Sequence, residues 1–83
     1  MNLLNVKKIE ENGALVTYEL TIDLGDITTT AQLLTDRDGN HAEWLNPVVP
    51  SLEVGEGQFW DELVSQLDDN PQVAADVEAY YED

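Results

Sequence analysis

The sequence predicts an α+β domain in which a three- or four-stranded antiparallel β-meander is followed by two C-terminal helices packed on one face. Apolar residues alternate with polar ones through the first half of the chain, which is the period of half-buried strands. Beyond a pair of prolines the apolar residues recur instead at helical spacing. We therefore expect one domain over residues 1–83, with the meander at about 3–46, a loop at 47–57 and helices at about 58–69 and 71–81.

The clearest strand is the run 14–24, in which every second residue is apolar. A three-residue loop precedes it and ends in a glycine, which can supply a positive φ. That loop sets Val6 opposite Tyr18 and Leu4 opposite Leu20. The apolar faces of the first two strands then coincide.

A Gly-Asp turn at 25–26 leads into the third strand. Pairing across this turn sets Leu24 beside Ile27, Ile22 beside Thr29, Leu20 beside Ala31 and Tyr18 beside Leu33. After a further Asp-Gly turn at 38–39, residues 41–46 could return as a short fourth strand with Trp44 opposite Leu33, but the sequence leaves open whether this strand forms. The other face of this sheet collects acidic, threonine and glutamine side chains, and we expect it to face water.

The first predicted helix has its apolar residues on one stripe, while acidic and amide residues fall elsewhere. The stripe comprises Phe59, Trp60, Leu63, Val64 and Leu67. Asn70 and Pro71 then have the pattern of an N-cap followed by proline at the first helical position, which predicts the start of a second helix. The residues expected to point inward from this helix are Val73, Ala74, Val77 and Tyr80.

Charge is the most unusual property of the chain. Eighteen Asp and Glu residues oppose three Lys and Arg residues, for a formal net charge of −15. Twelve of the acids follow Arg37, and no Lys or Arg does. A field of this sign disfavours direct binding to nucleic acid and to an anionic membrane. The 42% content of hydrophobic residues nevertheless indicates a folded domain rather than a disordered acidic tail.

The chain lacks the residue patterns on which catalysis and cofactor binding depend, so we expect neither an enzyme nor a bound cofactor or metal. It has no cysteine, and its one histidine, His41, lies beside a predicted hairpin turn. Asp36, Asp38 and Asn40 have the spacing that opens a calcium loop. However, His41 and Pro47 occupy the positions of the glycine and the bidentate glutamate that would complete it.

The charge is therefore the feature that indicates a function. Fifteen charges equal those on roughly 26 Å of duplex DNA, and a domain of this length has an expected diameter of about 30 Å. In composition and size, though in no motif, the chain resembles the small DNA-mimicking inhibitors that phages and mobile elements direct against host restriction, repair or CRISPR enzymes. The resemblance implies an acidic protein that inhibits or sequesters a basic nucleic-acid-binding protein.

Two groups of carboxylates are the candidate partner-binding residues. The predicted helices carry Asp61, Glu62, Asp68, Asp69, Asp76 and Glu78, and the outer face of the sheet carries Glu19, Asp23 and Glu43. In either group the carboxylates would stand in for phosphates and meet lysines and arginines of the partner.

Other interpretations remain open. A salt-adapted organism favours acidic surfaces on ordinary proteins, in which case the chain is a small structural or assembly protein whose acidity is environmental. The apolar residues of such a protein could form a homodimer. Trp44, Phe59 and Trp60 could also line a small-molecule pocket, although aromatic residues at this spacing more often belong to the core. The lack of cysteine and of an apolar leader predicts a cytoplasmic protein.

Overall fold

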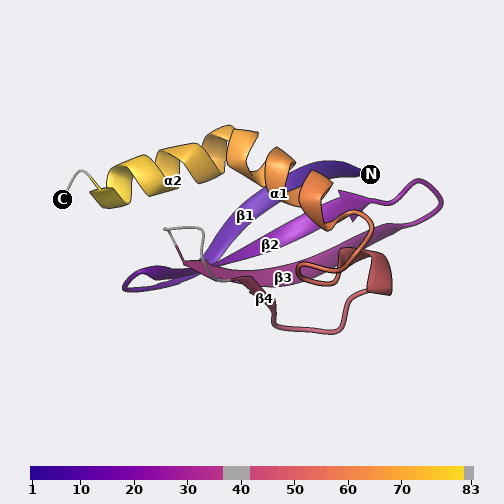
Figure 1. Cartoon of the computed structure of the whole chain (residues 1–83). Coiled ribbons are helices and arrows are strands. Elements are labelled where there is room, and N and C mark those ends of the chain that lie inside the picture. Colours follow the sequence, from indigo (N-terminus) through magenta and orange to yellow (C-terminus); the bar gives the residue numbers. More distant parts are fainter. Residues whose placement is uncertain (37–41, 82–83) are drawn as a thin grey trace.

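The structure is a computed structural model, and it describes residues 1–36 and 42–81. It confirms the predicted fold class: four antiparallel strands form one sheet in the order β1-β2-β3-β4, and two helices follow (Figure 1). The strands are β1 (Asn2–Asn12), β2 (Leu15–Asp23), β3 (Thr28–Asp36) and β4 (Ala42–Trp44), η1 is a 3₁₀ turn at Pro50–Leu52, and the helices are α1 (Trp60–Asp69) and α2 (Pro71–Tyr81). The fourth strand, which the sequence left open, is present, whereas His41 and the predicted turn at 38–39 lie outside the described residues.

The β2–β3 hairpin has the predicted register. Ile22 pairs with Thr29, Leu20 with Ala31 and Tyr18 with Leu33. The Leu24 backbone N–H donates to the Ile27 carbonyl oxygen (2.8 Å) and closes the turn, in which Gly25 has a φ of 104°. A side chain at that φ would be strained, so the turn depends on glycine. On the other side of β3, Trp44 of β4 lies opposite Leu33, as predicted.

The predicted register of the β1–β2 hairpin is wrong. Val6 lies opposite Leu20 rather than Tyr18, and Leu4 falls in a register shift instead of facing Leu20. The connecting turn has two residues rather than three, and β1 contains a second register shift at Ile9. Each bulge adds one residue to β1 and therefore changes which side chains face the core.

The two bulges decide the composition of the inner face of β1. Leu3 pairs with Ile22, Val6 with Leu20, and Lys8 with Tyr18, all on the face that contacts the core. The extra residues of the bulges, Leu4 and Ile9, are exposed. A lysine therefore occupies an inner position near the β1–β2 turn, where an apolar residue would continue the core.

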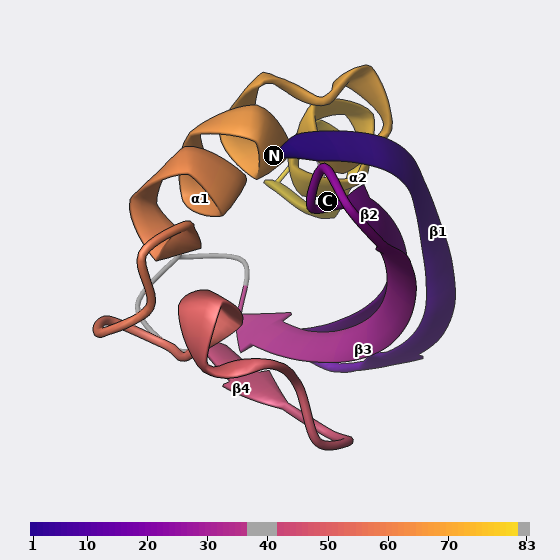
Figure 2. The ribbon, with the colours of Figure 1, turned by 90° about the vertical axis from the view of Figure 1, so that its right-hand side faces the viewer.

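The sheet is strongly curved, and α1 lies on its concave side (Figure 2). The core between them combines inward residues of the strands with one residue of η1 and one stripe of α1. It comprises Val6, Val16, Tyr18, Leu20, Ile22, Leu33, Leu52, Leu63 and Leu67. The burial of Leu63 and Leu67 confirms the predicted stripe of the first helix, and Trp60 and Val64 lie half-buried beside them.

A single residue, Asn70, ends α1 and begins α2. Its backbone N–H donates to the Leu67 carbonyl oxygen (3.1 Å), and its side-chain Oδ1 accepts the N–H groups of Gln72 (2.9 Å) and Val73 (3.3 Å). These bonds satisfy donors that the first turn of a helix leaves unpaired. The predicted N-cap and the proline that follows it are both confirmed.

α2 contributes no fully buried residue. Val73 and Val77 are half-buried, but Ala74 and Tyr80, which were expected to point inward, are exposed. The helix continues past α1 toward the end of the sheet that carries the β1–β2 turn (Figure 1). There the inner face of β1 carries Lys8 instead of an apolar side chain, so α2 meets this end of the sheet through a polar contact, whereas Val73 at the start of α2 packs against the core.

Candidate partner-binding surfaces

Four of the candidate carboxylates lie together on α1. The helix directs its apolar stripe toward the sheet, so its acidic residues occupy the outer face. Asp61, Glu62, Asp68 and Asp69 are all exposed there. Asp61 and Asp68 are two turns apart, as are Glu62 and Asp69, and two turns correspond to about 10.5 Å along a helix axis. The four carboxylates therefore form two rows along one helix, here called the α1 acidic face.

The last turn of α1 is an unfavourable place for negative charge. Asp68 and Asp69 lie in that turn, which contains no basic residue and carries the negative end of the helix dipole. Asp61 and Glu62 lie in the first turn, where the dipole favours them. Helix stability accounts for the first pair of acids. Of the second pair, Asp69 directly precedes the N-cap of α2, where negative charge is favourable, so Asp68 is the acid that helix stability does not explain.

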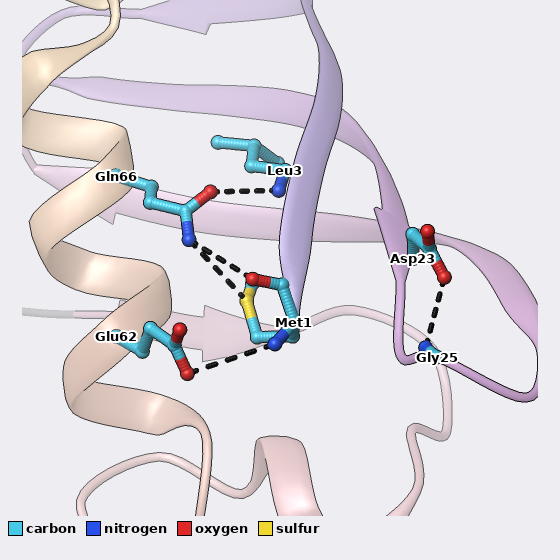
Figure 3. A network of polar contacts seen from close by, with 6 residues as sticks. All are labelled: Met1, Leu3, Asp23, Gly25, Glu62 and Gln66. Carbon is cyan, nitrogen blue, oxygen red and sulfur yellow. Dashed lines mark hydrogen bonds and ion pairs between the residues drawn. The ribbon is translucent and has the colours of Figure 1, made fainter.

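Polar contacts join α1 to the first residues of the chain (Figure 3). The Gln66 side chain accepts the Leu3 backbone N–H (2.8 Å) and donates to the Met1 carbonyl oxygen (3.1 Å). The Glu62 carboxylate lies 3.7 Å from the N-terminal ammonium group. Within residues 1–36 and 42–81, this is the one ion pair made by the α1 acidic face.

Asp76 lies apart from the α1 acidic face and has a structural role. Its side chain is 9% exposed, and it accepts hydrogen bonds from the Lys8 ammonium group (2.7 Å) and the Tyr18 hydroxyl (2.9 Å). Lys8 also donates to Glu11 (2.9 Å). The hydrogen bond to Asp76, followed by the one to Glu11, raises the pKa of Lys8 above its ordinary value of 10.5. Asp76 therefore fastens α2 to β1 and β2.

The three candidates on the sheet are dispersed. Glu19 is half-buried on β2, directly opposite Lys7 of β1. The half-buried Asp23 accepts the Gly25 backbone N–H (2.8 Å) and so supports the β2–β3 turn (Figure 3). Glu43 is exposed on β4. The structure thus brings together the acids of α1 and leaves those of the sheet separate.

The shape of the molecule changes the comparison with duplex DNA. The radius of gyration is 12.3 Å, but the chain is elongated, with extents of 41 × 20 × 20 Å. A duplex 41 Å long carries about 24 charges, against the 15 of this chain. The protein as a whole therefore does not reach the linear charge density of a duplex along its long axis.

Sequence reasoning missed a groove between the two helices and the sheet. Its volume is about 660 Å³, within the range of known binding sites. The floor consists of Val16, Tyr18 and Leu33 from the sheet, and the walls include Trp60 and Val64 of α1 and Val73 and Val77 of α2. The sequence indicated the valines of α2 as an inward stripe: Val73 packs against the core, and both Val73 and Val77 also line the groove.

Carboxylates surround this apolar groove. Asp36 at the end of β3, Asp68 of α1 and Glu78 of α2 all line it, one from each surrounding element. Two of these residues, Asp68 and Glu78, were among the predicted partner-binding residues. The groove therefore links the α1 acidic face to α2.

The structure gives little support to the other kinds of site considered, which are an aromatic pocket, a metal site and a membrane-spanning helix. The Trp44 and Trp60 rings meet edge to face, with 6.3 Å between their centroids, and with Phe59 they pack against the core. In the parts of the chain that the structure describes, no group of three or more His, Cys, Asp and Glu side chains is arranged to hold a metal ion. None of the described helices combines the length and apolarity needed to cross a membrane.

No family model, curated protein or solved structure matches this chain. A proposal about its function therefore depends on its own residues and their arrangement.

Proposed function

We propose that this chain is an acidic binding protein that mimics the charge of nucleic acid and inhibits or sequesters a basic nucleic-acid-binding protein. The observation that carries the proposal is the α1 acidic face. It presents four exposed carboxylates on one ten-residue helix, and among the described residues their one ionic partner is the chain's own N-terminus.

The spacing of these carboxylates supports the proposal and refines it. Ten helical residues span about 15 Å, so four charges correspond to one per ~4 Å. A single DNA strand carries one charge per ~3.4 Å, whereas the duplex carries one per ~1.7 Å. In mean charge density the α1 acidic face is therefore closer to one nucleic-acid strand than to a duplex, although its charges stand in two pairs about 10.5 Å apart. The surface we expect it to fit is a channel that contacts one backbone at a time.

The unfavourable position of one of these acids also supports binding to a basic partner. Asp68 opposes the dipole of α1, and Lys8, one of only three Lys and Arg residues in the chain, is paired with Glu11 and Asp76. Lysines and arginines of a partner would relieve the repulsion on α1. Uncompensated charge of one sign also accelerates encounter with a partner of the other sign.

The experiment uses the tagged protein as bait in a bacterial lysate, with washes of rising salt and identification of bound proteins by mass spectrometry. The test variant is D61N/E62Q/D68N/D69N, and the control is E19Q/D23N/D26N/E43Q, which removes the same four charges from the sheet and its turn. Circular dichroism verifies that both remain folded.

The expected result is a nucleic-acid-binding protein that is released by salt or by added single-stranded DNA, that the control captures, and that the α1 variant does not. Capture that survives neutralisation of α1, or that nucleic acid does not displace, would contradict the proposal. A protein that folds only at molar salt would support the environmental interpretation of the acidity instead.

A further inference from the structure

We propose that the groove between α1, α2 and the sheet binds an amphipathic helix of the partner, one whose apolar stripe is flanked by lysines or arginines. This deepens the proposed function and rests on it for the identity of the partner as a basic protein. The groove adds a contact that phosphate mimicry alone does not supply, because its surface is largely apolar.

The floor of the groove is already part of the folded core. Val16, Tyr18 and Leu33 are each 1% exposed, and they are held by strand pairing on β2 and β3. These side chains have almost no accessible surface, so they form a rigid base, and a ligand would contact the half-buried side chains of the walls above them. A preformed site lowers the cost of binding.

The walls are the part that an added helix would cover. Val64, Val73 and Val77 are only half-buried, although all three line the groove. Val73 and Val77 are one turn apart on α2, and residues at this spacing form the ridges between which side chains of a second helix pack. An apolar stripe at i, i+3 and i+4 on the incoming helix fits such a surface.

The groove remains open because of how α2 is attached. Asp76 reaches Lys8 and Tyr18 through hydrogen bonds of 2.7 and 2.9 Å, so α2 is held to the sheet by a polar contact near the β1–β2 turn. From α2 the groove is lined by Val73, Ala74, Val77 and Glu78, and none of these is fully buried. Within residues 1–36 and 42–81, the apolar side chains of the groove walls therefore keep part of their surface accessible.

The negative charge at the rim of the groove favours a positively charged ligand. Asp68 stands on the α1 side of the groove and Glu78 on the α2 side, and the net charge of the chain is −15. An acidic or neutral helix would bring no compensation, whereas cationic residues on both flanks of an apolar stripe would meet a carboxylate on each side. A basic amphipathic helix fits both the apolar walls and the acidic rim.

The test measures binding of a synthetic fluorescein-labelled amphipathic peptide, with leucines at i, i+3 and i+4 and lysines on both flanks, by fluorescence anisotropy. A scrambled peptide of identical composition is the control for non-specific charge attraction. Nitrogen-15 NMR of the full chain then maps the binding site. We expect the striped peptide to bind at least tenfold more tightly than the scrambled one, and to shift the Trp60 indole and the amides of Val64 and Val73.

Two variants with matched controls test the site. Ala74 lines the groove and is exposed, so A74W should obstruct it and weaken binding at least tenfold, while A75W, on the exposed adjacent position outside the groove, should not. D68N/E78Q should weaken binding by several-fold more than D61N/D69N, which removes the same charge away from the rim.

Equal binding of the striped and scrambled peptides, or of A74W and A75W, would overturn the inference. The outcome is separate from that of the lysate experiment, because A74W retains every carboxylate of the α1 acidic face. A peptide that fails to bind while nucleic acid still displaces a captured partner would reject the groove alone. Peptide binding without such a partner would reject nucleic-acid mimicry alone.

Discussion

Replacing Asp76 by alanine should destabilise the protein even though Asp76 lies on a helix near the end of the chain. The Tyr18 hydroxyl donates to this carboxylate at 2.9 Å, and Tyr18 itself is 1% exposed. A hydrogen bond to a charged acceptor contributes about 1.5–3 kcal/mol. Alanine is a better helix former than aspartate by up to ~0.7 kcal/mol, so the expected net loss is about 1–2.5 kcal/mol.

For a domain of this size, that loss corresponds to a decrease in Tm of about 4–20 °C. Urea and thermal unfolding followed by circular dichroism measure both quantities. E78A is the matched control, because Glu78 is an exposed acid on the same helix and its loss should change the free energy of unfolding by less than about 0.5 kcal/mol.

A double-mutant cycle identifies the interaction responsible. Y18F, D76A and the double variant together give the coupling free energy between the two side chains, which we expect to exceed about 1 kcal/mol. Coupling below about 0.5 kcal/mol, or a D76A variant as stable as E78A, would refute the assignment of Asp76 as the residue that fastens α2 to the sheet.

Three further predictions concern other contacts. Because the pKa of Lys8 is raised, the stability that its charge contributes is complete below pH 10.5 and is lost as the pH rises through the higher pKa of the folded state. Lys8→Met should therefore flatten the alkaline part of a plot of unfolding free energy against pH. An unchanged slope would contradict this. Asn70→Ala should cost about 1 kcal/mol in urea unfolding, whereas Asn70→Asp, which keeps a capping oxygen, should cost little; equal losses would exclude capping as the cause. Gln66→Ala should cost about 1–2 kcal/mol of unfolding free energy because it leaves the part-buried N–H of Leu3 without its acceptor. Glu62→Gln, at an exposed contact of 3.7 Å, should change stability by less than ~0.5 kcal/mol in the same assay. The reverse order would be inconsistent with the contacts in Figure 3.

The parts of the fold that the sequence predicted correctly depend on local chemistry. The register of β2 with β3 follows from strict alternation and from the two-residue turn at Gly25, and the start of α2 follows from Asn70 and Pro71. In each case the residues that determine the geometry are adjacent in the chain, so their pattern is sufficient.

The errors arose where tertiary contacts choose between local alternatives. Leu3 and Leu4 are both apolar, and either could face the core; the bulge that selects Leu3 becomes apparent only when β1 is placed on the curved sheet. The role of Asp76 depends on Lys8, which is 68 positions away. Spacing identified Val73 and Val77 as an inward stripe, but it carries no information about the distance between α2 and the sheet.

The same reasoning applies to the candidate site. Composition identified acidity as the distinctive property, and helical periodicity placed four acids on the outer face of α1. Periodicity could not distinguish the exposed Asp68 from Asp76, which is largely buried and accepts hydrogen bonds from Lys8 and Tyr18. Nor could it reveal the groove, which four elements, β2, β3, α1 and α2, create together.

The bulges of β1 also affect how molecules of this protein meet one another. An outer strand of eleven residues would ordinarily offer a long ladder of N–H and C=O groups to a strand from another molecule. The interruptions at Leu4 and Ile9 divide that ladder into short segments, and on the other edge β4 is only three residues long. The β1 edge is therefore a poor template for intermolecular strand addition, and this protection does not weaken when salt screens the mutual repulsion of the negative charges.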